Sequence, residues 1–138
     1  MRNVLLDAGP QVALFAPDDR HHTRFDALIT ELSAEGLRLL TTWPCVVEAS
    51  YLLDPPHRFE LLQWLGLGGA QIHAFDGHDL PDIIQWIRRY TDRRREMDLA
   101  DASLYWLAIA TGITEVMTVD EMDFQRYRLP DGKRFVVL

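Results

Sequence analysis

Residues 1–15 read MRNVLLDAGPQVALF, an apolar run that ends at Asp7 and then turns at a Gly-Pro pair. Residues 3–6 show no polar alternation, which is typical of a parallel strand covered on both faces. A carboxylate follows this stretch directly, and the apolar residues at 12–15 have the spacing of a helix. The opening therefore predicts a strand, an acid at its carboxyl end and a helix, which is how an α/β fold begins.

The rest of the chain repeats this alternation of short apolar runs and helical spacing. No segment is long enough to act as a linker, so residues 1–138 are expected to form a single domain. The expected fold is a three-layer α/β/α domain with a mostly parallel central sheet of about four or five strands. Further strands are expected at residues 37–40, 71–75, 115–119 and 134–138, and helices at 22–35, 43–52, 59–67, 81–87 and 98–109.

Composition excludes several classes of protein. Hydrophobic residues make up 48% of the chain and charged residues 25%, which excludes a disordered, collagen-like or coiled-coil protein. No apolar run approaches the roughly 18 residues of a membrane-spanning helix, so no membrane association is expected. Because Cys45 is the single cysteine, no internal disulfide can form, and we expect a protein of the reducing cytoplasm. Cys45 itself is expected to be a small buried side chain.

The charge balance bears on the partners of the protein. Fourteen basic residues against 21 acidic ones give a formal charge of −7. A protein that holds nucleic acid by a general positive field is expected to be basic, so either nucleic acid is not the partner or the acids have another task. A bound divalent cation would raise the formal charge from −7 to −5, which makes metal-dependent RNA binding compatible with this composition.

Carboxylates gather near the predicted carboxyl edge of the sheet. Asp7 and Asp120 follow strands directly, and the carboxyl ends of parallel strands share one edge, so these two are expected to meet. Oxygen ligands without histidine or cysteine suit Mg²⁺ or Mn²⁺ rather than zinc. Any one acid alone could instead be a helix cap or a solvated surface group. The acids concerned are Asp7, Glu48, Asp98, Asp101, Asp120 and Asp123.

Four segments carry a resemblance to a known family. They are VLLDAGPQVALF at 4–15, TTWPCVVEASYLL at 41–53, MDLADASLYWLA at 97–108 and MTVDEMDF at 117–124. In this order and at this spacing they resemble the PIN-domain family, in particular the VapC-like toxin ribonucleases of type II toxin–antitoxin systems. The resemblance covers nearly the whole chain and implies a single PIN-like domain.

The resemblance implies a function and a site. It implies an endoribonuclease that uses Mg²⁺ or Mn²⁺ to activate water against an RNA phosphodiester, leaving 5′-phosphate and 3′-hydroxyl ends. It also implies a cytoplasmic homodimer that a cognate antitoxin neutralises, with no nucleotide cofactor. Thr118 matches a hydroxyl position near the family's site. The catalytic and metal-binding acids matched are Asp7, Glu48, Asp101 and Asp120, and Asp98 and Asp123 match further acids that bind metal directly or orient its ligands.

Five arginines stand close together before the helix at 98–109. They could bind RNA phosphates, dock an acidic antitoxin segment, or simply form a solvated helix end that complements the helix dipole. The four tryptophans are expected in the core, although one or two could line a dimer or antitoxin groove. The arginines are Arg88, Arg89, Arg93, Arg94 and Arg95, and the tryptophans are Trp43, Trp64, Trp86 and Trp106.

Two other functions remain open from the residues alone. A receiver-like phosphoacceptor domain also gathers acids around Mg²⁺, but it needs an acidic pair after the first strand, whereas Ala8 follows Asp7 here. A PIN fold retained as a catalytically inactive binding module is the second alternative, and the intact set of acids argues against it.

Overall fold

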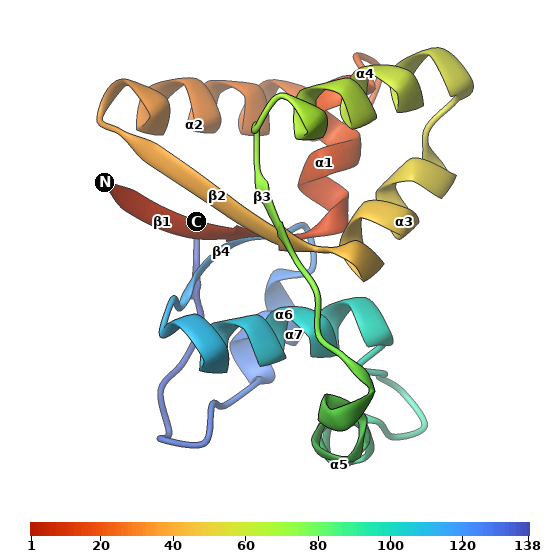
Figure 1. Ribbon diagram of the computed structural model, residues 1–138, viewed down its shortest axis with the longest axis vertical. Helices are drawn as coiled ribbons and strands as arrows, with labels where there is room; N and C mark the ends of the chain where they lie inside the picture. Colours follow the sequence, from red (N-terminus) through yellow and green to blue (C-terminus); the bar gives the residue numbers. More distant parts are fainter.

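The computed structural model describes residues 1–138 and has a central sheet of five parallel strands in the order β3-β2-β1-β4-β5 (Figure 1). The chain winds from β1 outward to β3 on one side and then crosses to β4 and β5 on the other. The order reverses between β1 and β4, and open α/β sheets bind ligands at such a switch point. The strands are β1 (Arg2–Leu6), β2 (Leu37–Thr42), β3 (Gln71–His73), β4 (Glu115–Met117) and β5 (Val136–Val137).

Helices cover both faces of this sheet, which confirms the expected three-layer α/β/α architecture. In Figure 1, α1, α2 and α4 lie on one side of the sheet and α5, α6 and α7 on the other. Helix α3 contacts both α1 and α6, so it joins the two layers beyond the end of β2. The helices are α1 (Ala8–Phe15), α2 (His22–Ala34), α3 (Trp43–Leu52), α4 (Pro55–Gly66), α5 (Leu80–Tyr90), α6 (Leu99–Thr111) and α7 (Glu121–Arg126), with a short 3-10 turn at Gly77–Asp79.

The strand order also separates the fold from one alternative. Receiver-like domains have the order 2-1-3-4-5, in which the first and third strands are neighbours. Here β1 pairs with β2 and β4, and β3 pairs with β2 alone. The receiver-like phosphoacceptor hypothesis is therefore wrong.

Helices α1 and α4 begin several residues earlier than the sequence predicts, one helix was not predicted, and the other elements differ from their expected bounds by at most three residues at either end. Helix α1 begins at Ala8 rather than at residue 12, since the carboxylate of Asp7 accepts a hydrogen bond from the Ala8 amide at 2.8 Å. Helix α4 begins at Pro55, because proline at the first helical positions lacks only an amide that has no partner there. Helix α7 was not expected, and its six residues are too few for hydrophobic spacing to reveal.

Helix α6 is the most buried helix, and its direction matters for the site. It is buried on nearly all sides, with Ala102, Leu104 and Leu107 fully inaccessible to solvent. It leads into β4, which is parallel to the rest of the sheet, so α6 runs back against the strands and begins at their carboxyl ends. None of the helices has the length and apolar character needed to cross a lipid bilayer.

Candidate metal centre

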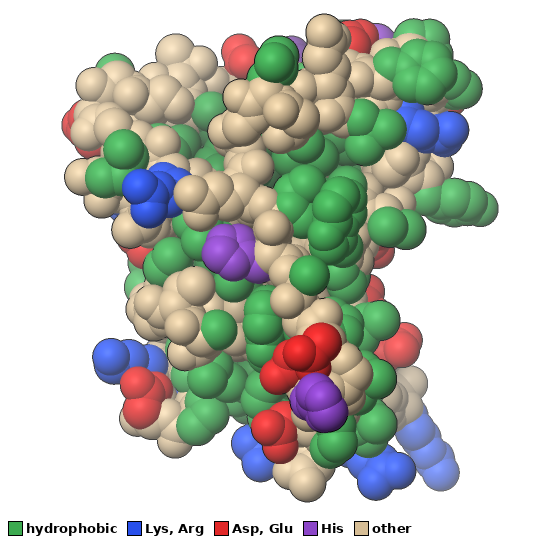
Figure 2. Space-filling model, viewed as in Figure 1, with side chains coloured by type: hydrophobic (Ala, Val, Ile, Leu, Met, Phe, Trp, Pro, Cys, Tyr) green, Lys and Arg blue, Asp and Glu red, His purple; other side chains and the backbone are tan.

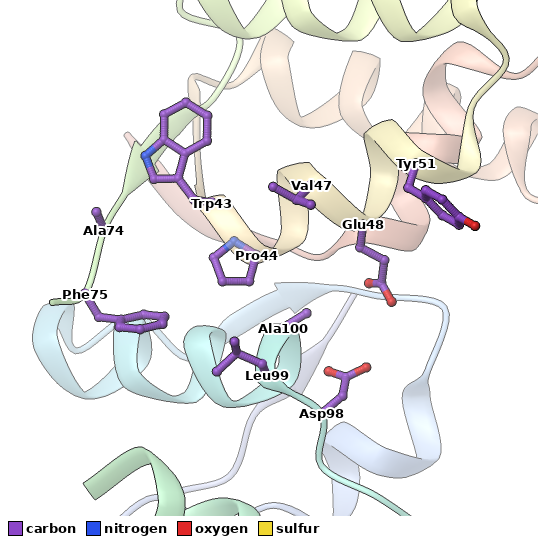
Figure 3. A pocket seen from close by; sticks show the side chains of 10 residues that line it. All are labelled: Trp43, Pro44, Val47, Glu48, Tyr51, Ala74, Phe75, Asp98, Leu99 and Ala100. Carbon is purple, nitrogen blue, oxygen red and sulfur yellow. The ribbon is translucent and has the colours of Figure 1, made fainter. Parts of the chain in front are cut away.

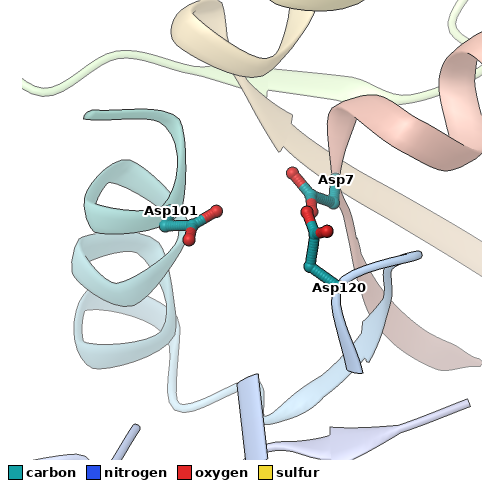
Figure 4. A group of neighbouring side chains, drawn as sticks. All are labelled: Asp7, Asp101 and Asp120. Atoms are coloured by element: carbon teal, nitrogen blue, oxygen red, sulfur yellow. The ribbon is translucent and has the colours of Figure 1, made fainter. Parts of the chain in front are cut away.

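Three aspartates meet at the switch point of the sheet (Figure 4). Asp7 follows β1, Asp120 follows β4, and Asp101 lies in the first turn of α6. Each offers a carboxylate oxygen, and these oxygens all lie within 4.8 Å of one another. Asp7 and Asp101 are buried, and Asp120 is exposed. The arrangement is a small anionic site that opens to solvent on the Asp120 side.

Thr118 holds two of these acids in place. Its hydroxyl donates a hydrogen bond to Asp7 Oδ2 at 2.7 Å and accepts one from the Asp120 amide at 3.0 Å. Thr118 is fully buried next to the end of β4. One hydroxyl therefore orients the Asp7 carboxylate and fixes the turn that carries Asp120.

Asp101 is held through its backbone amide and through its side chain. Its amide donates to Asp98 Oδ1 at 2.8 Å, so Asp98 acts as the N-cap of α6. The hydroxyl of Tyr127, at the end of α7, donates to Asp101 Oδ2 at 2.6 Å. The first contact caps the helix, and the second fixes the Asp101 carboxylate, which faces Asp7 and Asp120 in Figure 4.

Burial and mutual repulsion make these carboxyl groups hard to ionise. Loss of solvation and, after it, the negative charges of Asp7 and Asp98 together raise the pKa of Asp101 to about 8, although the hydrogen bond from Tyr127 lowers it. Burial also raises the pKa of Asp7 to about 6 against the stabilising hydrogen bonds from Thr118 and the Ala8 amide. The pKa of Asp120 is raised by partial burial and by its acidic neighbours Asp123 and Asp98.

The other three predicted acids stand outside this group of three. Glu48 is exposed on α3, and its pKa is raised by partial burial and by the charges of Asp98 and Asp120. Glu48 therefore belongs to the same electrostatic field, and Figure 3 shows its side chain reaching toward that of Asp98. Asp123 forms an ion pair with Arg126 at 3.5 Å.

The five arginines lie at the end of α5 and in the segment that leads to Asp98. Two of them belong to a turn in which Asp92 Oδ1 accepts hydrogen bonds from the amides of Arg94 and Arg95. Four of the five are exposed, and none forms an ion pair within the chain. These guanidinium groups are consequently available to bind an anionic partner.

An apolar groove of about 700 Å³ adjoins the acidic site, and Figure 3 shows its lining between α3 and the start of α6. Glu48 and Asp98 stand on its acidic side. Three large side chains of α3 that line the groove remain well exposed: Trp43 at 51%, Val47 at 63% and Tyr51 at 83%. Figure 2 shows hydrophobic side chains gathered on this face around α3. Trp64, Trp86 and Trp106 instead pack against the core.

No protein-family model and no curated protein sequence matches the chain. Among solved structures, VapC20 of Mycobacterium tuberculosis has a similar fold, with a TM-score of 0.68 over 82% of this chain and 86% of that one. The chain has a PIN-like fold. The two sequences are 15% identical, and VapC20 is described as a sarcin-ricin loop cleaving toxin. The PIN-like α/β/α architecture expected from the four sequence segments is confirmed.

Sequence reasoning missed two residues that shape the site in this PIN-like fold. Tyr127 lies 26 residues beyond Asp101, and no periodicity or motif connects them. Gly9 lies in the first turn of α1, where a Cβ atom would stand 2.5 Å from Val119 Cγ2. Val119 separates Thr118 from Asp120, so the absence of a side chain at Gly9 lets α1 approach the end of β4. A glycine two residues after Asp7 was the available signal.

Replacing Gly9 by alanine is expected to push Val119 away and to widen the site while the fold persists. The new methyl group overlaps a β-branched side chain, and such overpacking typically costs about 1–3 kcal/mol. We expect weaker Mn²⁺ binding by calorimetry together with an unchanged circular dichroism spectrum. Gly77→Ala is the control, because nothing lies within 4 Å of a Cβ there. Equal Mn²⁺ affinity in both variants would contradict this reading of Gly9.

Proposed function

We propose that this protein is a metal-dependent endoribonuclease, a single PIN-like domain acting as the toxin of a toxin–antitoxin pair. The observation that carries the proposal is the convergence of Asp7, Asp101 and Asp120 at the switch point of this fold. The similarity in fold to VapC20, which is described as a sarcin-ricin loop cleaving toxin, supports the same class of activity. Cellular RNA in the cytoplasm is the proposed substrate.

The donor set fits Mg²⁺ or Mn²⁺. All three converging side chains are carboxylates, which hard divalent cations prefer, and two of them are buried where unpaired negative charge is costly. The thiol of Cys45 lies 3.8 Å from Asp7 Oδ1, but burial raises its pKa well above the ordinary value, so it is not a thiolate ligand. A cation would therefore stabilise the ionised carboxylates without help from sulfur or imidazole.

Each residue has a proposed part in hydrolysis. Asp7, Asp101 and Asp120 would hold the cation, and Asp98 and Asp123 would orient them from outside the group. A divalent cation in such a site polarises a phosphoryl oxygen and lowers the pKa of water. Glu48, at the rim with a raised pKa, would accept a hydrogen bond from the attacking water. Thr118 keeps the Asp7 carboxylate facing the site.

The arginines are the proposed RNA-binding surface. Replacing Arg93, Arg94 and Arg95 together by glutamine is expected to weaken RNA binding and to reduce the salt dependence of log K by about 2, at roughly 0.7 per phosphate contact. Fluorescence anisotropy with a labelled RNA at several salt concentrations measures both. The control is Mn²⁺ affinity, which the substitutions leave unchanged. Normal RNA binding with a loss of antitoxin binding would assign the arginines to the antitoxin instead.

A homodimer and a cognate antitoxin are the proposed protein partners. The exposed apolar side chains around α3 support this, because large apolar side chains that cluster on a surface are typical of a protein–protein contact. We propose that a second copy of the chain covers this groove. Light scattering of the purified protein measures the mass, and Tyr51→Glu is expected to give the monomer.

The decisive experiment incubates purified protein, free of antitoxin, with total RNA in Mn²⁺, Mg²⁺ or EDTA. Cleavage in either cation and none in EDTA is the expected result. Sequencing the ends of the fragments then gives the target and tests for 5′-phosphate products. A folded protein that binds RNA without cutting it in any metal would support the inactive binding module.

A further inference from the structure

Tyr127 is the one side chain that donates a hydrogen bond to Asp101. The phenol oxygen lies 2.6 Å from Asp101 Oδ2, and both residues are buried. A hydrogen bond to a carboxylate is shorter and stronger than one between neutral groups. One oxygen of Asp101 is therefore held in a fixed direction by the residue that follows α7, 26 residues further along the chain.

The ring of Tyr127 is itself held on several sides. The guanidinium of Arg126 lies 5.3 Å from the centre of the Tyr127 ring and 5.7 Å from that of Tyr90. The rings of Tyr90 and Phe124 meet it edge to face, with centroids at 5.0 and 5.3 Å. Arg126 also donates to the Tyr90 carbonyl at 2.9 Å. The hydroxyl is thus supported by packed neighbours and has little freedom to turn away.

The partner of this hydroxyl distinguishes Tyr127 from the other two tyrosines of the cluster. Tyr105 and Tyr90 donate to the Arg128 carbonyl at 2.5 and 3.1 Å, which is the ordinary way for a phenol to satisfy its hydrogen bond on a backbone. Tyr127 donates instead to a side-chain carboxylate that stands beside Asp7 and Asp120. Residues that hydrogen-bond to metal ligands fix their direction, and their loss typically lowers metal affinity or activity about 10–100-fold.

We propose that Tyr127 is a positioning residue: its hydroxyl holds Asp101 Oδ2 so that the carboxylate presents its other oxygen to the divalent cation. This inference rests on the proposed function, because it assigns Tyr127 a part in the same metal centre. Thr118 does the corresponding work for Asp7 through Oδ2. Each of the two buried acids is therefore oriented by one hydroxyl: Asp7 by the residue that follows β4, and Asp101 by the residue that follows α7.

The test is a calorimetric titration of Mn²⁺ into wild type, Tyr127→Phe and Tyr105→Phe. The matched control removes the hydroxyl of an equally buried tyrosine that contacts only a backbone carbonyl. We expect the Mn²⁺ dissociation constant to rise about tenfold or more in Tyr127→Phe and to stay within about twofold in Tyr105→Phe. Circular dichroism and melting in EDTA establish that both variants fold.

A second readout needs no folded variant at position 127. When Mg²⁺ binds the Asp101 carboxylate, the electrostatic environment of the Tyr127 phenol changes. A tyrosine difference spectrum is therefore expected in wild type and not in Asp101→Asn. Equal Mn²⁺ affinity in wild type and Tyr127→Phe, or no difference spectrum in a wild type that binds metal, would overturn the positioning role alone. A wild type that binds neither cation would overturn the proposed function and this inference together.

Discussion

RNA cleavage by an Asp7→Asn protein is expected to fall on the order of 10²- to 10³-fold, because a lost metal ligand removes several kcal/mol of transition-state stabilisation. Asparagine keeps the shape of the side chain and one oxygen, and Asp7 directly follows the buried residues of β1, Val4 to Leu6. The loss is therefore expected in activity and in Mn²⁺ affinity, with the fold retained. Fragment yield per unit time at saturating Mn²⁺ measures the activity.

The control for this prediction is Asp18→Asn, which removes the same charge at an exposed acid that forms no ion pair. Its cleavage rate is expected to equal that of wild type. If Asp7→Asn cut RNA as fast as Asp18→Asn, the switch-point acids would not be the catalytic centre. The nuclease activity would then have to be sought elsewhere or attributed to a contaminant.

Without metal, an Asp101→Asn protein is expected to be more stable than wild type near pH 8. Burial and the neighbouring acids raise the folded-state pKa of Asp101 from 3.8 to about 8, so folding disfavours the ionised group. The folded state then holds a proton that the unfolded state has released. The proton on Asp101 therefore contributes fully to the free energy of unfolding below about pH 4, and this contribution is lost as the pH rises toward about 8. Asp7, with a pKa of about 6, adds a loss in the lower part of this range.

Thermal melting in EDTA between pH 5 and pH 8 measures the effect. The wild-type midpoint is expected to fall with rising pH relative to that of Asp101→Asn, which lacks the titrating group, by about 5 °C or more at pH 8. Millimolar Mn²⁺ is expected to reverse the order, since a cation that binds only the folded state stabilises it by about 2.7 kcal/mol at one hundred times its dissociation constant. If the difference between the two melting midpoints stayed the same at all pH values, folding would not affect the ionisation of Asp101, and this prediction would be wrong.

Much of this fold was predictable because its pattern is local. Strand β1 and helix α6 are long apolar elements with clear ends, and both lie close to where the sequence placed them. Strands β3 and β5 have three and two residues, and runs so short carry little periodicity. Helix α7 has six residues and is polar at its ends, so its existence depends on Phe124 packing into the core.

The positions of the acids were likewise predictable only in part. Asp7 and Asp120 could be paired from the sequence, since each follows a parallel strand and such strands end at one edge. Asp101 was less certain, because a helix can begin at either edge until its neighbours in the sheet are known. The structure places it with the other two, whereas Glu48 stands at the exposed rim.

The sequence by itself determined the α/β alternation, the parallel sheet and the edge at which its acids gather, because these follow from burial of short apolar runs. Only the tertiary structure decided the strand order, the close approach at Gly9 and the hydrogen bond from Tyr127 to Asp101. The reason is physical: contacts between side chains depend on how α1, α6 and α7 pack against the sheet. That packing depends on contacts between residues far apart in the chain, so the spacing of neighbouring residues does not predict it.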